Sequence, residues 1–399
     1  MKPSSYKRQS GQRPMRPFKT GVVLAGGGAR AAYQVGVLKA VAELLDRDEP
    51  NPFPVISGTS AGAINGAALA IYATQFHTGV QRLRYVWEHF HVHHVFRADA
   101  LGVLRNSAWW LAALLTGGLG KYNPRSLLDR KPLHDLLTTR LPCEAIRYSI
   151  EQGALHAFGV TASGYSSGQS VTFYQGVDSI KPWQRVRRLG IADEITVDHL
   201  MASSALPLIF SAEKLHREYF GDGTMRQIAP LSPALHLGAD RLLVIGVRVE
   251  QLPAFERAAG ENYPSIAQIA GHSLNSIFLD SLEADLERLQ RINNTVTMLG
   301  KVVDHNIPLR RVESLVISPS APLDEIAAKY AHLLPKPVAF LFSGIGVYKR
   351  GGGNFLSYLL FEKEYCRELI NLGYKDAMQR KEQLVSFLTD ESYVSPDDD

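Results

Sequence analysis

Two glycine-rich turns near the start of the chain limit the fold more than any other feature. Residues 21–25 form a short apolar run that passes through three glycines into residues 33–45, where apolar side chains recur at helical spacing. Residues 54–57 form a second apolar run, followed by a sharp turn at 58–62 and a small-residue helix over 61–73. Two successive units of strand, turn and helix predict a parallel sheet with crossover helices.

The remaining pattern extends this architecture. Further strands are predicted at residues 155–162, 171–174, 241–247 and 314–318, and helices at 81–90, 124–137 and 196–204. After about residue 249 the pattern changes to long amphipathic helices, at 266–290 and 358–388. We expect a mobile basic tail over 1–19, a three-layer α/β domain with a parallel sheet over 20–250, and a mainly helical C-terminal region over 251–399 that can share its last strand with the sheet.

Composition excludes several classes of protein. With 399 residues, 45% hydrophobic and only 2 cysteines, the chain is neither disordered, collagen-like nor a disulfide-stapled miniprotein. The net charge of +4 is too small to indicate a nucleic-acid partner. Every charged side chain up to residue 42 is basic, so the tail can attract anionic lipid headgroups or simply be solvated.

No window approaches the 18 or more apolar residues that a transmembrane helix needs. The nearest stretch, residues 107–119 with Trp109 and Trp110, suits a membrane-interface segment or a buried core helix equally well. The apolar run at 21–25 is too brief for a signal peptide. We therefore expect an unexported, cytoplasmic protein, with peripheral membrane association left open.

The glycine turn carries the first chemistry. Consecutive glycines before a helix turn tightly and present N–H groups that suit an anion or a developing negative charge, and an arginine adds positive charge. The residues are Gly26, Gly27, Gly28, Ala29 and Arg30. The stretch also matches a dinucleotide-binding fingerprint, with Asp46 or Asp48 as the acid. That match is weak, because both aspartates precede the second strand instead of closing it.

The second turn is a Gly-x-Ser-x-Gly elbow, which holds a serine on a strained strand-to-helix junction with its Oγ exposed. It comprises Gly58, Thr59, Ser60, Ala61 and Gly62. An N-cap role for the serine is the simpler alternative. A serine nucleophile needs a base. The histidines over 89–94 alternate with aromatic and apolar residues, which predicts an amphipathic wall in place of a metal site, and His236 and His272 remain possible bases.

Asp222 is the better candidate base. It lies between two glycines, in a turn that another loop can approach closely. A carboxylate accepts a serine proton directly if burial raises its pKa toward the working range. An Asp-Gly turn without chemistry is the alternative.

Together these segments resemble the patatin-like phospholipase family, over about residues 20–250. Four patterns match in family order: Gly-Gly-Gly-x-Arg at 26–30, the elbow at 58–62, Ala-Ser-x-x-x-Pro at 202–207, and Asp222 with Gly223. The resemblance implies that Ser60 is the nucleophile and Asp222 its base, in a dyad without histidine. It further implies an oxyanion hole formed by the N–H groups of the glycine turn with support from Arg30, and neither cofactor nor metal.

Two positions depart from the family pattern. Ala31 replaces a glycine and adds only a methyl group at a helix start, so we expect it to be tolerated. Thr224 replaces glycine or alanine after Asp-Gly, and its β-branched side chain is expected to tilt the aspartate loop and lower efficiency.

The function implied is a serine acyl hydrolase that cleaves fatty-acyl esters of phospholipids or lysophospholipids through an acyl-enzyme. An ordinary α/β-hydrolase fits less well, because only one strand-helix unit precedes the elbow here. Three alternatives stay open: a lipid acyltransferase with the same nucleophile, a dinucleotide-binding oxidoreductase, and a non-catalytic lipid-binding scaffold.

Overall fold

A computed structural model describes residues 18–99, 126–249, 263–299, 310–349 and 351–390, together with Trp109 and Thr116. The expected basic tail, apart from Phe18 and Lys19, lies outside the described residues. The apolar stretch over 107–119 also lies outside the described residues, apart from Trp109 and Thr116. Within the described part of the chain, no helix combines the length and the apolar character that crossing a membrane requires.

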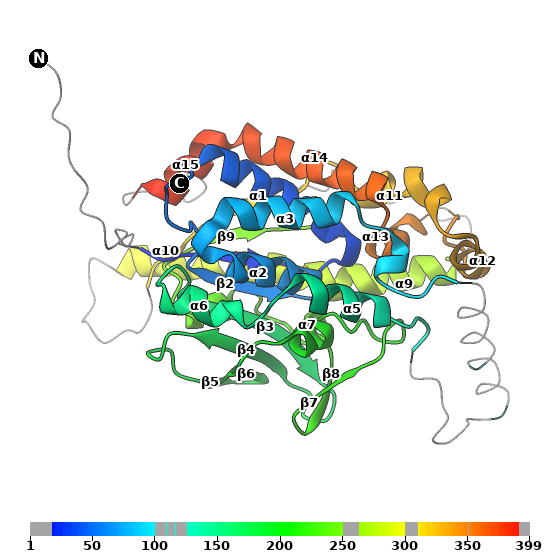
Figure 1. Ribbon diagram of the computed structural model, residues 1–399, viewed down its shortest axis with the longest axis horizontal. Helices are drawn as coiled ribbons and strands as arrows, with labels where there is room; N and C mark the ends of the chain where they lie inside the picture. Colours follow the sequence, from blue (N-terminus) through cyan, green and yellow to red (C-terminus); the bar gives the residue numbers. More distant parts are fainter. Residues whose placement is uncertain are drawn as a thin grey trace, which may run out of the picture.

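A mostly parallel sheet forms the centre of the fold (Figure 1). Strands β10, β9, β1, β2 and β3 are neighbours in that order and all run parallel, while β4 and β8 pair antiparallel with β3. The strands are β1 Thr20–Leu24, β2 Val55–Thr59, β3 Ala157–Gly164, β4 Ser170–Gly176, β5 Trp183–Arg185, β6 Arg188–Ala192, β7 Glu213–Leu215, β8 Glu218–Asp222, β9 Arg241–Ile245 and β10 Glu313–Ile317.

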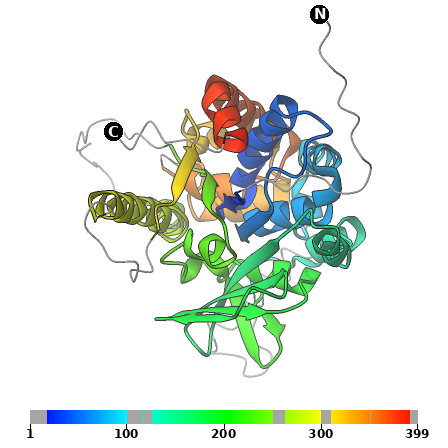
Figure 2. The same cartoon turned by 90° about the vertical axis from the view of Figure 1, so that its left-hand side faces the viewer.

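Helices cover both faces of the sheet. In β1, Val22 and Leu24 point into one apolar core and Val23 into the other, as the two-residue repeat of a strand requires. Figures 1 and 2 show α1, α14 and α3 together over the larger core. The helices are α1 Ala32–Leu44, α2 Ala61–Ile71, α3 Phe76–Glu88, α5 Lys131–Arg140, α6 Ala145–Glu151, α7 Val197–Ser203, α8 Ser232–His236, α9 Ile266–Asn275, α10 Ser281–Leu299, α11 Leu323–Tyr330, α12 Lys336–Gly344, α13 Gly353–Leu359, α14 Lys363–Gln379 and α15 Lys381–Thr389.

The second face is covered by α8 and α10, whose apolar side chains pack with those of β1, β2 and β9. Helix, sheet and helix therefore form three layers, and the predicted α/β class with a mostly parallel sheet is confirmed. The last strand, β10, lies beside β9 in the same sheet. The C-terminal helices also pack on the core, so the domain limit near residue 250 stays a prediction.

Two expected long helices are interrupted. The stretch predicted over 266–290 contains a π-helical turn at Ser276–Asp280, between α9 and α10. The stretch predicted over 358–388 divides into the end of α13, then α14 and α15. Helices α13, α14 and α15 all pack on the larger core, whereas the π-helical turn leads from α9 on the larger core to α10 on the smaller one.

Candidate active site

The register of β3 brings the serine and the aspartate together. Strand β2 pairs with β3 as far as Thr59 opposite Thr161, and β8 pairs with β3 from Asp222 opposite Ala162. Because β4 occupies one edge of β3 along this length, β2 and β8 share the other edge and meet there end to end. The residues that end these strands therefore lie side by side, although 162 positions separate Ser60 from Asp222.

Ser60 occupies the strained elbow that the sequence predicts. Its backbone has φ 56°, in the left-handed region that non-glycine residues rarely adopt. The flanking glycines permit the turn, because a Cβ on Gly62 would lie 2.2 Å from the carbonyl oxygen of Leu24. Helix α2 begins directly after the serine, so its Oγ lies at a helix N-terminus.

The hydroxyl of Ser60 donates a hydrogen bond to Asp222 Oδ2 at 2.6 Å. The other carboxylate oxygen, Oδ1, accepts from the backbone N–H of Thr224 at 3.0 Å and from its hydroxyl at 2.6 Å. Burial raises the pKa of Asp222 to about 6, and these hydrogen bonds together with the charge of Arg130 oppose the rise. Thr224, which departs from the family pattern, thus orients the carboxylate of Asp222 with two hydrogen bonds, one from its backbone N–H and one from its hydroxyl.

The glycine turn lies beside the elbow. Gly28 has φ 56°, and a Cβ there would lie 2.2 Å from the carbonyl oxygen of Tyr358 on α13. Among the described residues, no acceptor is bonded to the N–H of Gly27 or Gly28, and Gly28 lines the same cavity as Ser60. The turn can therefore offer N–H donors to a group bound at the serine.

Buried polar side chains hold this turn in place. Gln34 donates to the carbonyl of Ala25 at 2.7 Å, and Asn65 of α2 donates to Gln34 at 2.9 Å. Trp87 of α3 donates in turn to Asn65 at 2.9 Å. The chain of hydrogen bonds links the glycine turn to α2 and α3.

Arg30 points toward the C-terminal helices. Its Nε donates to Ser357 Oγ at 2.8 Å, Nη2 donates to Asn354 at 3.3 Å, and the guanidinium lies 4.1 Å from the centre of the Tyr358 ring. The side chain is 3% exposed. Arg30 therefore joins the turn to α13, and support of an oxyanion through this contact stays a prediction.

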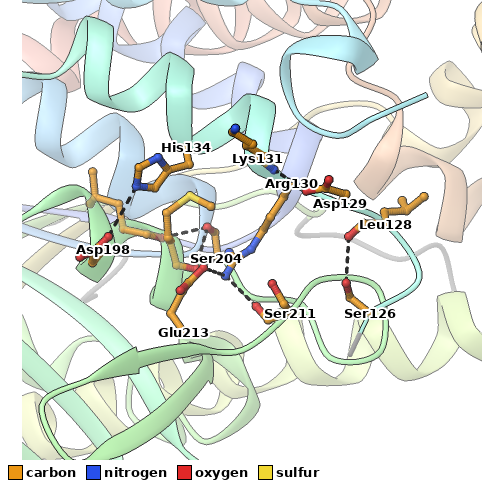
Figure 3. A network of polar contacts seen from close by, with 12 residues as sticks. Ser126, Leu128, Asp129, Arg130, Lys131, His134, Asp198, Ser204, Ser211 and Glu213 are labelled. Carbon is orange, nitrogen blue, oxygen red and sulfur yellow. Dashed lines mark hydrogen bonds and ion pairs between the residues drawn. The ribbon is translucent and has the colours of Figure 1, made fainter. Parts of the chain in front are cut away.

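Arg130, which the sequence did not single out, extends its side chain toward Ser211 and Glu213 (Figure 3). Its guanidinium donates to the backbone carbonyls of Met201 and Ser211 and to Glu213, at 2.8 Å in the last case. The side chain is 3% exposed, and its charge lowers the pKa of Asp222 against the effect of burial. An isolated arginine before a helix carries no local motif, so only the fold reveals this role.

A cavity of about 580 Å³ opens at Ser60 and Asp222. It follows α2 from Ala61 to Tyr72, and its walls are largely apolar. Those walls come from α2, α3, α5 and α13 and from the segments that follow α3, α7, α9 and α13. They include Ile64, Ala68, Leu83, Val86, Trp87, Phe90, Val95, Leu133, Leu136, Leu137, Leu206, Phe210, Phe278, Leu359 and Phe361.

The histidines considered as bases lie elsewhere. His236 stacks on Trp183 at 4.8 Å between ring centres, and His272 is exposed on α9. In the 89–94 stretch, His91 pairs with Glu362 at 2.8 Å, and the neighbouring Phe90 lines the cavity. The amphipathic wall predicted for this stretch is therefore confirmed.

Comparison with known proteins places this geometry in a family. The sequence profile described as "Patatin-like phospholipase" matches residues 22–235, more than half of the chain. Among the curated proteins, none matches. The solved structure of VipD from Legionella pneumophila is similar to this chain at 12% identity and a TM-score of 0.34, over 92% of this chain and 67% of that one. The chain belongs to the patatin-like phospholipase family, which implies lipid acyl hydrolase activity in general.

Proposed function

We propose that the protein hydrolyses fatty-acyl esters of phospholipids or lysophospholipids through a Ser60–Asp222 dyad and an acyl-enzyme. The observation that carries this proposal is the 2.6 Å hydrogen bond from Ser60 Oγ to Asp222 Oδ2 in the wall of a largely apolar cavity. An ionised carboxylate at that distance is placed to accept the hydroxyl proton.

In the first half of the reaction, Ser60 Oγ attacks the ester carbonyl carbon while its proton passes to Asp222 Oδ2. The negative charge on the carbonyl oxygen is stabilised by the N–H groups of the glycine turn, chiefly Gly27 and Gly28. When the C–O bond to the alcohol breaks, Asp222 returns the proton to the leaving oxygen. Water then attacks the acyl carbon of the acyl-enzyme, and Asp222 accepts its proton. When the bond between the acyl carbon and Ser60 Oγ breaks, Asp222 returns that proton to Oγ, and the fatty acid leaves.

The cavity accounts for an acyl substrate. Helix α2 advances 1.5 Å per residue, so the distance from Ala61 to Tyr72 is about 16 Å. An extended alkyl chain, with C–C bonds of about 1.5 Å, advances about 1.25 Å per carbon. A chain of about 12 carbons would therefore fill the groove along α2 and exclude water from the ester.

Fluorophosphonate labelling with mass-spectrometric identification of the modified residue tests the proposal. Label on Ser60, lost in Ser60→Ala and retained in Ser204→Ala, supports it. Ser204 is a matched control, because it also lines the cavity but its hydroxyl donates to the carbonyl of Leu200. Asp222→Asn should fold and lose turnover of a short p-nitrophenyl ester. Label on another residue, or full turnover by Asp222→Asn, would show that the dyad is misassigned.

Hydrolysis and acyl transfer share the acyl-enzyme, so the acceptor distinguishes them. We propose water as the main acceptor, and product analysis with added lysophospholipid measures the ratio of free fatty acid to transacylated lipid. Transacylated lipid as the main product would assign the protein as an acyltransferase.

Peripheral membrane binding belongs to the same proposal. Exposed apolar side chains lie on α9, where Ile266 and Ile269 are one turn apart, and on α12, where Phe340 is 84% exposed. The two helices adjoin, because Ala267 N–H donates to the carbonyl of Ile345 just after α12. Ile266→Ser with Phe340→Ser should reduce binding to anionic liposomes and spare hydrolysis of a soluble ester. Unchanged liposome binding would remove this surface from the proposal.

A further inference from the structure

A cluster of two histidines and one aspartate lies apart from the cavity. Asp193 follows β6, His199 lies on α7, and His216 lies in the turn between β7 and β8. One side-chain atom from each lies within 4.8 Å of the others. None of the three lines the cavity at Ser60. We propose that these side chains bind a divalent transition-metal ion of the zinc class. The ion braces α7, whose Ser203 contacts the Ser60 elbow, against the β7–β8 hairpin, which carries Asp222.

The two distances to Asp193 Oδ2 are close to those of tetrahedral coordination. Zinc binds histidine nitrogen and carboxylate oxygen at about 2.0 to 2.2 Å, so neighbouring ligand atoms of a tetrahedral site are about 3.3 Å apart. His199 Nε2 already lies 3.3 Å from Asp193 Oδ2. His216 Nε2 is 2.7 Å from the same oxygen and must move away by about 0.6 Å to reach that separation. The His216 side chain is 66% exposed on a hairpin turn, so little opposes the movement.

The surrounding hydrogen bonds can orient two of the ligands. Thr196 Oγ1 lies 3.0 Å from His199 Nδ1, where it can accept the proton that a zinc-bound imidazole carries on its other nitrogen. Asp193 Oδ1 accepts from the backbone N–H of Glu194 at 2.9 Å, which leaves Oδ2 for the metal. Without metal, the Thr196 N–H donates to His199 Nδ1 at 3.2 Å. That bond is lost when Nδ1 carries the proton, and water can take its place because Thr196 is exposed.

The exposed side of the cluster provides the path for the ion. His199 is 5% exposed and fixes the inner ligand, whereas His216 faces solvent. A water molecule can complete the tetrahedron from that side. Three protein ligands of this chemistry, histidine nitrogen with carboxylate oxygen, suit zinc better than calcium or magnesium, which prefer oxygen ligands alone.

A bound ion would connect three neighbouring elements, the end of β6, helix α7 and the β7–β8 turn. Helix α7 ends at Ser203, which accepts the backbone N–H of Ser60, and β8 ends at Asp222. A metal holding His199 on α7 and His216 in the β7–β8 turn would fix the relative positions of the helix and the hairpin. Because the ion contacts neither Ser60 nor Asp222, its expected role is stabilisation and not chemistry.

The test uses the full-length protein freed of metal with a chelator. In a calorimetric titration, the parent should bind one more Zn²⁺ ion per molecule than His216→Ala or Asp193→Asn. Co²⁺ should produce visible absorption typical of low-symmetry, four-coordinate sites in the parent, which both variants lose. Zn²⁺ should also raise the midpoint of thermal unfolding in the parent and not in the variants.

His332→Ala is the matched control, since His332 is exposed and its imidazole contacts the carbonyl of Lys329 in place of a carboxylate. This variant should bind Zn²⁺ as the parent does. His216 is exposed, so its replacement should fold, and the unfolding midpoint without metal checks this. Equal Zn²⁺ stoichiometry and equal Co²⁺ spectra for the parent and His216→Ala would overturn the proposal and leave the cluster as a hydrogen-bonded group only.

Discussion

The backbone N–H of Ser60 donates to the hydroxyl of Ser203 at 2.8 Å, and that hydroxyl donates to the carbonyl of Thr161 at 2.6 Å. Ser203 thereby fastens the elbow to β3. The left-handed backbone of Ser60 costs about 1 to 3 kcal/mol and persists only where the surroundings hold it. We infer that Ser203 is a positioning residue for the elbow.

Ser203→Ala should lower the kcat of a soluble ester more than it changes KM, because it loosens the elbow without altering the cavity wall. The buried N–H of Ser60 would lose its acceptor, which should cost about 1 to 3 kcal/mol in the free energy of unfolding. Urea unfolding and steady-state kinetics measure both effects. Ser204→Ala is the control, since its hydroxyl bonds to the carbonyl of Leu200 within its own helix region. Equal kcat for Ser203→Ala and the parent would contradict the role.

The pKa of Asp222, raised to about 6 by burial, sets the acid limit of activity. Only the ionised carboxylate accepts the Ser60 proton. We therefore expect kcat/KM to fall about tenfold per pH unit below pH 6 and to level off above about pH 7. A plateau that continues down to pH 4 would exclude Asp222 as the base.

Arg130 offers a way to shift that limit. Its charge lowers the pKa of Asp222, so Arg130→Met should move the acid limb of the pH profile, where activity falls, to higher pH. Arg130→Lys retains the charge and should leave the limb closer to that of the parent. Glu213→Gln removes a negative charge beside Arg130 at a position that is 32% exposed, and should move the limb in the opposite direction. An acid limb identical in all these variants would mean that another group titrates.

Asp222→Asn should be more stable than the parent at neutral pH. The carboxyl has a higher pKa in the folded state than in the unfolded chain, where aspartate titrates near pH 3.9. Its contribution to stability is therefore full below about pH 4 and is lost as the pH rises through 6. Asparagine is neutral and avoids this loss, so above pH 6 its free energy of unfolding should exceed that of the parent by up to about 3 kcal/mol. Thermal unfolding at pH 4 and pH 8 tests the sign, and a smaller advantage at pH 8 than at pH 4 would contradict it.

The sequence predicted the parts of the fold whose local chemistry is distinctive. Gly26 to Gly28, and Gly58 with Gly62, mark sharp turns, because glycine adopts backbone conformations that other residues rarely do. The apolar runs before these turns are strands in the structure. The hairpin strands β5 to β8 were missed, because they are short and partly exposed and so lack a clear alternation of apolar residues.

The same contrast applies to the candidate site. Ser60 and Asp222 each lie in a turn with a recognisable pattern, whereas Arg130 and Ser357 act through contacts that only the tertiary structure creates. Arg30 and Ser357 are separated by 327 positions, and no local pattern links them. The break between α9 and α10 was missed as well, since Ser276–Asp280 continues the amphipathic pattern while changing the helical pitch.

Gly28→Ala should abolish most of the activity. A methyl group there would lie 2.2 Å from the Tyr358 carbonyl oxygen, so the glycine turn or α13 must shift. Loss of one oxyanion donor typically lowers kcat about 100- to 1000-fold. Gly153→Ala is the control. Gly153 has φ 68°, so the variant has a similar backbone strain to Gly28→Ala, but an added Cβ there would meet no atom within 4 Å. Equal activity losses in the two variants would attribute the effect to global strain and not to the turn.

Ala68→Trp should shorten the acyl chain that the protein accepts. Ala68 lines the cavity on α2, seven residues after Ala61, which places it about 10 Å along the groove from the serine. At about 1.25 Å per carbon, esters of up to about 8 carbons should still fit, while those of 12 or more should lose at least about tenfold in kcat/KM. A series of p-nitrophenyl esters measures the profile, and Ala68→Ser should match the parent. Thr78→Trp, from the distal wall on α3, provides a second obstruction that should affect only the longest chains. A profile that neither tryptophan changes would show that the acyl chain does not enter the groove along α2.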